Sequence, residues 1–280
     1  MRFLFLFYFF LCYTEAYSQD KFRFASEDVT ELNTPYVEEV YNYGIINIDL
    51  LEKCPKLRKI KFDGYKNPNI TFYLGNLKQV KHIILYGFAY TEIPCWIHEI
   101  IELEQIELEF NRIPVINSHV FKHSSLKKLN IAVQSSNFVK QLTLEVPTEI
   151  NVTLNELDLS ANKLVIPDNF FCFLPRLKKL KLVECKGGLP ISITCLKELE
   201  YLDISKSDIT SLPDDIDELL SIKKLILKDT KITKLPESIH NLKNLEELNM
   251  LGTNICTTNE ERIAFIEKII VNNPNIQIWW

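Results

Sequence analysis

Apolar residues recur along this chain at a fixed spacing of 23 positions, as at Leu202, Leu225 and Leu248. These residues lie at equivalent places in three near copies of one segment, Leu199–Ile216, Ile222–Ile239 and Leu245–Ile255. A period of this length predicts a solenoid of stacked units, because one unit alone cannot bury its apolar face.

The apolar anchor can be followed through nine units. Successive anchors lie 23 residues apart, except for one step of 28 and one of 22, and they are Ile60, Ile83, Ile106, Leu129, Leu157, Leu180, Leu202, Leu225 and Leu248. A degenerate tenth unit is expected near Val37–Ile45. The 28-residue step contains an alternating segment, Phe138–Val146, which predicts either an extra strand on the convex side or a protruding loop.

Around each anchor, apolar and polar positions alternate. In one unit Leu202 and Ile204 alternate with Tyr201, Asp203 and Ser205. A period of two predicts a strand that points the apolar pair into the solenoid and the other three side chains toward an exposed, concave face.

The second half of each unit has a different pattern. After the strand, apolar residues recur at every third position, as at Ile216, Leu219 and Ile222, which predicts a short α or 3-10 segment on the convex side. Because proline cannot donate a ladder hydrogen bond, we expect the strands to end at a recurring Leu-Pro or Ile-Pro step, at Pro167, Pro190, Pro213 and Pro236.

These features resemble the leucine-rich repeat family, in its 23-residue L-P-x-x-I-x-x-L-x-x-L type. The resemblance covers about Leu57–Ile255 and is tighter in the last five units. It implies an α/β solenoid: a curved horseshoe with a parallel β-sheet on its concave face and short helical or 3-10 segments on its convex face.

The family places asparagine at the centre of the motif, where its side chain bonds the backbone of adjacent turns. In this chain the column reads Tyr65, Phe88, Asn111, Gln134, Asn162, Cys185, Ser207, Thr230 and Thr253. Tyrosine and phenylalanine do not fit that slot. Either the register is shifted in the first two units, or their turns are built differently.

The start of the chain is typical of a signal peptide, residues 1–18. Arg2 precedes an apolar run, Phe3–Cys12, and the small residues Ala16 and Ser18 follow. The run is about half of the ~20 residues that a membrane-spanning helix needs. We therefore expect cleavage rather than a transmembrane anchor, and no transmembrane segment after signal removal.

The remaining chain divides into a cap with a degenerate repeat (19–56), the repeats (57–255) and a C-terminal cap (256–280). In the last cap, Ile263, Ile266 and Ile270 have the spacing of one helix face within Asn259–Val271. A last short strand is expected over Asn275–Trp280. Its two tryptophans either cover the open end of the core, which we favour, or bind a partner.

Composition and motifs argue against several function classes. The net charge is −5 and the basic residues are scattered, whereas a nucleic-acid-binding protein needs a basic stripe. Glycine-rich phosphate loops are absent, so no cofactor is expected. The sequence contains no catalytic constellation, and we expect no enzyme.

The histidines do not suggest a metal site. The segment from His98 to Glu102 begins like a zinc-protease helix but lacks the second imidazole. The i, i+4 pair His119 and His123 has no third ligand nearby in the sequence, and we interpret it as a surface coincidence. No metal site is therefore predicted.

Six cysteines remain after signal cleavage: Cys54, Cys95, Cys172, Cys185, Cys195 and Cys256. Their positions favour buried free thiols over a disulfide framework, and Cys172–Cys195 is the pair that adjacent units would bring together. Cysteine-rich end caps are absent, which is more typical of a bacterial exported protein than of an animal receptor ectodomain. We expect a secreted, periplasmic or cell-surface protein.

The concave face is the best candidate for a functional surface, since apolar residues at exposed strand positions often mark interaction sites. The candidate partner-binding residues are Ile84, Tyr86, Val183, Tyr201, Asp203, Lys224, Ile226, Asn249 and Leu251. A protein or peptide partner is expected first. The alternatives are a carbohydrate or cell-envelope binding module, and a regulatory subunit that acts within an enzyme complex.

Overall fold

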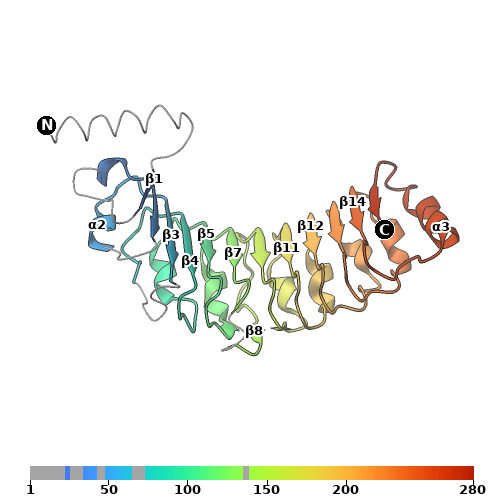
Figure 1. The fold of residues 1–280 in the computed structure, drawn as a ribbon, viewed down its shortest axis with the longest axis horizontal. Helices are drawn as coiled ribbons and strands as arrows, with labels where there is room; N and C mark the ends of the chain where they lie inside the picture. The colour runs from blue at the N-terminus through green and yellow to red at the C-terminus, as the bar shows by residue number, and fades with distance from the viewer. Residues whose placement is uncertain (1–22, 26–33, 43–47, 65–72, 135–138) are drawn as a thin grey trace.

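The computed structural model describes residues 23–25, 34–42, 48–64, 73–134 and 139–280. The signal-peptide prediction and Tyr65 lie outside these residues. Within them, twelve strands form one parallel sheet along the concave side of a curved solenoid (Figure 1). In spatial order these are β1 (Arg23–Ala25), β2 (Glu39–Asn42), β3 (Lys59–Asp63), β4 (His82–Tyr86), β5 (Gln105–Glu107), β7 (Lys128–Asn130), β9 (Glu156–Asp158), β11 (Lys179–Lys181), β12 (Tyr201–Asp203), β13 (Lys224–Ile226), β14 (Glu247–Asn249) and β15 (Gln277–Trp279).

The register of the sheet confirms the nine anchors. Each anchor pairs directly with the next along the row that runs from Ile60 to Leu248. The row continues at both ends, with Val40 beside Ile60 and Ile278 beside Leu248. The degenerate tenth unit and the last short strand are thus present, and β1 adds a strand before them.

The nine anchored strands bury their anchors and leave the residues on either side partly or fully exposed, except at Asn130, which is buried beside Leu129. The anchors are at most 1 % exposed, so their side chains form a continuous core between the sheet and the convex segments. This alternation confirms which side chains face the concave surface.

A left-handed residue, not proline, follows the strand in eight of the nine anchored units. Four positions after the anchor the backbone takes a positive φ, with glycine at Gly87 and Gly252 and with non-glycine residues at φ between 52° and 57° at Phe110, Val133, Ala161, Glu184, Lys206 and Asp229. A Cβ at residue 252 would lie 2.0 Å from Asp229 Oδ1, so any other residue there would force the Asp229 side chain to move. The expectation that proline ends the strand is therefore wrong.

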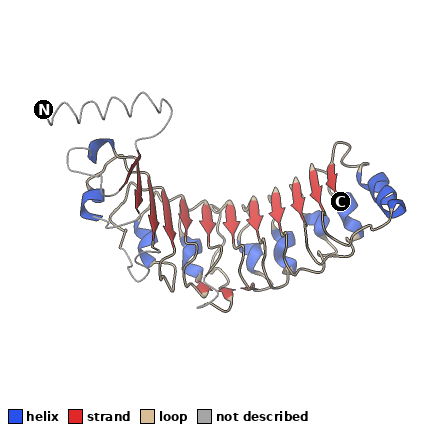
Figure 2. Ribbon diagram, viewed as in Figure 1, coloured by secondary structure: helices blue, strands red, loops and turns tan. Residues whose placement is uncertain are grey.

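The prolines act later in the unit. Pro190 and Pro236 immediately precede convex 3-10 segments, with extended backbones. The convex layer (Figure 2) consists, among the described residues, of η3 (Cys95–Glu99), η4 (Ser118–Lys122), η5 (Phe170–Phe173), η6 (Ile191–Cys195), η7 (Ile216–Glu218) and η8 (Glu237–Asn241). At the N-terminal end lie η2 (Thr34–Tyr36) and α2 (Ile48–Glu52).

The 28-residue step adds a strand on the convex side, one of the two predicted outcomes. Strand β8 (Leu142–Leu144) pairs in parallel with β6 (Val115–Ile116) and with β10 (Leu164–Val165). These three form a small second sheet behind the main one (Figure 2). Leu129 still pairs with Leu157, so the concave register continues without interruption.

The central column bonds successive turns as the resemblance implies. Asn111 Nδ2, Gln134 Nε2, Asn162 Nδ2 and Cys185 Sγ each donate to a carbonyl of the preceding unit. The threonines of the last two units instead donate to carbonyls of their own unit.

Phe88 occupies the same column in a turn that is built differently. It is buried, and a Cβ at Gly64 in the preceding unit would lie 2.6 Å from its ring. The register of this unit is correct, because Ile83 pairs with Ile60 and with Ile106. Glycine at position 64 makes the room that the aromatic ring needs.

The C-terminal cap is α3 (Asn259–Ile269), followed by β15. Thr258 caps the helix and forms a capping box with Glu261. The predicted helix is present, but its predicted face, Ile263, Ile266 and Ile270, is wrong, since the buried residues are Phe265 and Ile269.

The cysteines are only partly as expected. Cys172 and Cys195 form a disulfide between η5 and η6 of adjacent units, with a Cα–Cα distance of 5.0 Å. The preference for free thiols is wrong for this pair. Cys54 and Cys185 are free and buried, Cys95 is exposed, and Cys256 is partly exposed.

Candidate partner-binding surface

The nine candidate residues occur in two groups on the sheet. Ile84 and Tyr86 lie on β4, whereas the other seven lie on or just after β11 to β14. Tyr201, Lys224 and Glu247 are paired across β12, β13 and β14. Four strand spacings of ~4.8 Å separate β4 from β11, so the two groups begin about 19 Å apart.

The larger group forms an apolar and aromatic surface that polar residues surround. Ile226 pairs with both Asp203 and Asn249, and Leu251, two residues beyond β14, is 43 % exposed. All nine candidates are partly or fully exposed. A partner that lies along β12 to β14 would therefore cover contiguous apolar and hydrogen-bonding groups.

Tyr201 is held in place by its neighbours. Its hydroxyl donates to Asp203 Oδ2 at 3.0 Å, and Lys179 Nζ lies 5.4 Å from the ring centroid. Burial and the Asp203 carboxylate raise the pKa of the tyrosine above its usual value. The hydroxyl therefore stays protonated at physiological pH, and the fixed ring can contact a partner at low entropic cost.

Two of the candidates also have a structural task that the sequence reasoning missed. Asp203 Oδ1 accepts a hydrogen bond from Ser205 N, and Asn249 Oδ1 accepts one from Leu251 N. Asn130 and Asp158 accept equivalent bonds. The sequence contains a sign of this structural role. An asparagine or aspartate at the end of a strand, just before the turn, is typical of an Asx turn, in which its side chain accepts from the backbone N two residues on.

Opposite charges pair across the strands in the N-terminal half. Glu107 Oε1 lies 3.0 Å from His82 Nε2 and 3.4 Å from Lys128 Nζ. The hydrogen bond from His82, with help from Lys128, lowers the pKa of Glu107 to about 2. This side chain is a fixed negative charge on the concave face.

Glu109 differs from Glu107. Burial and the nearby carboxylates of Glu107 and Asp158 raise its pKa, while a 2.6 Å hydrogen bond from Asn130 Nδ2 acts in the opposite direction. The Tyr86 ring of the smaller candidate group packs against Phe110, with centroids 4.7 Å apart. The smaller group thus combines an aromatic surface with carboxylates.

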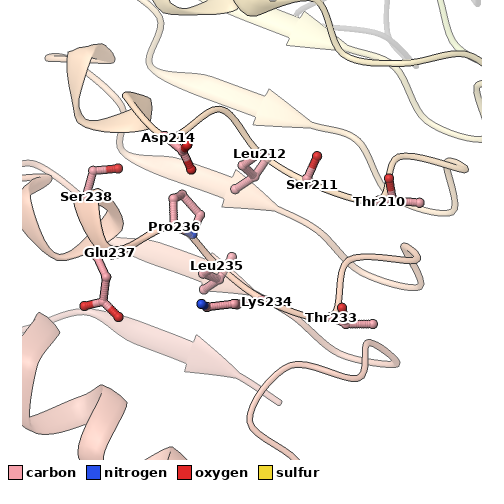
Figure 3. Close-up of a pocket in the computed structure, with 10 residues that line it drawn as sticks. All are labelled: Thr210, Ser211, Leu212, Asp214, Thr233, Lys234, Leu235, Pro236, Glu237 and Ser238. Atoms are coloured by element: carbon pink, nitrogen blue, oxygen red, sulfur yellow. The ribbon is translucent and has the colours of Figure 1, made fainter.

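Hollows elsewhere on the surface do not include the candidate residues. One of about 450 Å³ lies between two consecutive turns on the flank of the solenoid and is lined by residues such as Thr210, Asp214, Lys234, Glu237 and Ser238 (Figure 3). Hydroxyl, charged and apolar side chains all contribute to its lining, and none of the lining residues is a histidine or a cysteine.

The interpretation of His119 and His123 as a surface pair is wrong for His123, whereas His119 is partly exposed. His123 is 3 % exposed, and His98 from the preceding unit packs against both rings. Across the part of the chain that the structure describes, no three His, Cys, Asp or Glu side chains are arranged to hold a metal ion.

One of the two sequons of the chain has a structural role. Asn151 is buried; its Nδ2 donates to Phe121 O at 2.7 Å, and its Oδ1 accepts from Leu154 N at 2.7 Å. An amide with these bonds is not accessible for glycosylation in the folded chain. The other sequon, at Asn69, lies outside the described residues.

Neither a protein-family model nor a curated protein matches the chain. Solved structures do match. The leucine-rich repeat domain of FLRT2, from an octameric complex with latrophilin 3 and Unc5D, gives a TM-score of 0.67 at 20 % identity and covers 87 % of this chain and 74 % of that one. A leucine-rich repeat protein of Leptospira interrogans gives 0.58 at 20 % identity, over 88 % of this chain and 73 % of that one.

A plant receptor shows the same likeness over a shorter part of its length. The ectodomain of the Arabidopsis thaliana receptor kinase GASSHO1/SCHENGEN3, solved in complex with Casparian strip integrity factor 2, gives a TM-score of 0.60 at 24 % identity. The match covers 79 % of this chain but 28 % of the receptor chain. These likenesses establish the leucine-rich repeat solenoid, the α/β fold expected from the sequence.

Proposed function

We propose that this chain is an exported, non-catalytic leucine-rich repeat protein that binds a protein or peptide partner through its concave face. The observation that carries the proposal is the surface over β12 to β14, where Tyr201 lies on β12, Ile226 on β13 and Leu251 two residues beyond β14. A rigid tyrosine surrounded by apolar and hydrogen-bonding side chains is typical of protein interfaces.

The size of the sheet is consistent with this function. Adjacent strands are ~4.8 Å apart, so the seven spacings from β4 to β14 extend over about 34 Å. A standard protein interface buries ~800 Å² on each partner, which a face of this length can supply. Two of the similar solenoids were solved in complexes with other proteins or peptides, which supports a binding role.

Two observations support export. The N-terminal 18 residues have the composition of a signal peptide. The disulfide Cys172–Cys195 is of a kind that persists in oxidising compartments.

No helix among the described residues has the length and apolar character to span a membrane. Mass spectrometry of the secreted chain should find its N-terminus near Gln19; an intact N-terminus would contradict export by this signal.

Introducing charge on the concave face tests the concave-face proposal. Replacing Tyr201, Ile226 and Leu251 by aspartate places three charges on a surface that a partner must dehydrate. We expect the partner captured by the parent chain from extracellular extract, once identified and purified, to bind the triple variant at least 100-fold more weakly by calorimetry. This corresponds to about 3 kcal/mol, the size of one or two interface hot spots.

The matched control carries the same three charges on other surfaces. Ile191, Leu220 and Val271 are 65 %, 59 % and 77 % exposed and lie outside the strands of the concave sheet. Their replacement by aspartate should leave affinity unchanged. If the control weakens binding as much as the concave variant, the partner does not use the concave face.

A carbohydrate or cell-envelope ligand remains the alternative. Tyr86 and Tyr201 lie on β4 and β12, too far apart to stack on one small sugar. A glycan array probed with the parent chain separates the two. Specific glycan signals that the Tyr201→Asp change abolishes would replace the protein partner in this proposal.

A further inference from the structure

Three histidine rings meet on the convex side between adjacent units. His98 lies on η3, His119 on η4, and His123 directly follows η4. The centroid of the His98 ring is 5.5 Å from that of His119 and 5.6 Å from that of His123. These rings thus bring side chains of two successive turns into contact on the convex side.

The hydrogen bonds of His123 require the neutral imidazole. Its Nε2 lies 3.1 Å from Ile97 O and 3.2 Å from Ile100 O, and since carbonyls only accept, Nε2 carries the proton. Nδ1 then accepts from Ser125 N at 3.2 Å. A second proton on Nδ1 would face the Ser125 N–H, donor against donor, and this bond would break.

The Nε2 atoms of His98 and His119 have no neighbouring group that would stabilise a positive charge on their rings. Among the described residues, Nε2 of each ring is sealed from solvent and lacks a hydrogen-bond partner. Burial, the other two histidines and Lys122 lower the pKa of His98, and burial lowers that of His123.

Nearby carboxylates are engaged elsewhere. Glu99 on η3 bonds Tyr73 and pairs with Lys78, and Glu145 accepts from the Ser118 backbone at the start of η4. The positive charge of Lys122 opposes protonation, and no carboxylate is among the groups that shift His98 or His123. Protonation of the cluster therefore adds uncompensated positive charge.

We propose that these three histidines form an acid-sensitive contact, which holds η3 against η4 at neutral pH and weakens in acid. The direction follows from linkage. A histidine with a depressed pKa in the fold binds its proton more readily once the contact opens, so the contact is stable above the ordinary pKa of ~6.5 and weakens as the pH falls below it. The proposal does not depend on the identity of any partner.

Hydrogen exchange at pH 7.5 and 5.5 tests the proposal on the full chain. After correction for the intrinsic exchange rate, we expect amides in residues 94–126 to open about tenfold more often at pH 5.5 for each histidine that is kept neutral by the fold. Amides over η5 to η7 should change far less. An equal loss of protection in all units would overturn the proposal.

The variant His98→Phe keeps a ring of similar size and removes the titrating group. It should fold, since it replaces an unpartnered buried nitrogen with carbon, and its acid response in residues 94–126 should be reduced several-fold. The control His240→Phe, on η8, should leave that response as in the parent chain. An unchanged response in His98→Phe would overturn the proposal.

A measurement on the parent chain makes the test independent of any variant. An NMR titration of the His98 and His123 ring protons should give pKa values for both below the ordinary ~6.5. Values at or above it would overturn the proposal even if the variant failed to fold.

Discussion

In eight of the nine anchored units the residue four positions past the anchor adopts a positive φ angle; Gly64, four positions after Ile60, is the exception. Only Gly87 and Gly252 do so without a Cβ, and six other units use residues for which the left-handed region is unfavourable. The geometry is imposed by the stacking of the turns, because neighbouring strands hold the chain on both sides. The repeat therefore contains strain at known positions.

Ala161→Gly should stabilise the protein. Ala161 has φ = 57°, and the left-handed conformation costs a non-glycine residue about 1–2 kcal/mol, while glycine loses about 0.5–1 kcal/mol of unfolded-state entropy. We expect a net gain of about 0.5–1 kcal/mol in the free energy of unfolding, measured by urea denaturation. The control Ala132→Gly, at a buried position without positive φ, should lose stability. A loss of stability in both variants would contradict the inference that the backbone at Ala161 is strained.

The sequence predicts which side chains face outward, because alternation depends only on local backbone geometry. It does not predict what those side chains contact. The bond from Tyr201 to Asp203 and the contact of His98 with two histidines of the next unit depend on rotamers and on the lateral distance between units. The bond from Ser205 to Asp203 is different, because it is local and follows the Asx-turn pattern of the sequence, and it was overlooked when Asp203 was predicted as a binding residue.

At the scale of elements, strands were predicted better than convex segments. A strand needs only a period of two and an anchor in register, both of which are visible in the sequence. The face of α3 was mispredicted because the helix carries two apolar stripes, and only packing selects between them. Phe265 contacts the rings of His240 and Trp280, and this contact buries the Phe265 stripe.

The sheet should also lose stability in acid through the contact of β4, β5 and β7 at Glu107. Its depressed pKa of about 2 means that its contribution is complete above the ordinary pKa of 4.5 and is lost as the pH falls from 4.5 toward 2. Glu107→Gln should therefore lower the free energy of unfolding by about 1–3 kcal/mol at pH 7. Near pH 2 the two chains should be equally stable.

Thermal unfolding at several pH values measures this difference. The control Glu184→Gln removes a carboxylate whose partner, Lys206, is exposed, and such a pair contributes little. A constant gap between Glu107→Gln and the parent chain at all pH values would show that packing, not charge, explains the loss.

At the scale of the whole molecule, stability is shared between neighbouring units, so the ends matter more than their size suggests. The C-terminal cap places Phe265 and Ile269 over the last unit, while Trp280 packs against Phe265 and under Arg262. Trp279 is 52 % exposed. Of the two predicted roles for the tryptophans, Trp280 covers the core, and Trp279 remains available at the surface.

Phe265→Ala should loosen this end before the rest of the solenoid. Loss of a buried phenylalanine costs about 3–5 kcal/mol, somewhat less at a position that is 7 % exposed. We expect hydrogen exchange to accelerate over residues 237–280 while residues 73–134 keep their protection. Uniform acceleration along the chain would instead indicate that the solenoid unfolds as one cooperative body.

The unbroken pairing of Leu129 with Leu157 has a consequence for how such a chain can change in evolution. Among the described residues of the 28-residue step, the added strand β8 lies behind the sheet. Insertions and deletions on that side can alter the mass and outline of a unit without moving any side chain on the concave sheet. The length of a unit and the side chains of its concave surface can therefore change independently in this protein. For the same reason, a peptide tag inserted near residue 140 should leave the concave surface unchanged.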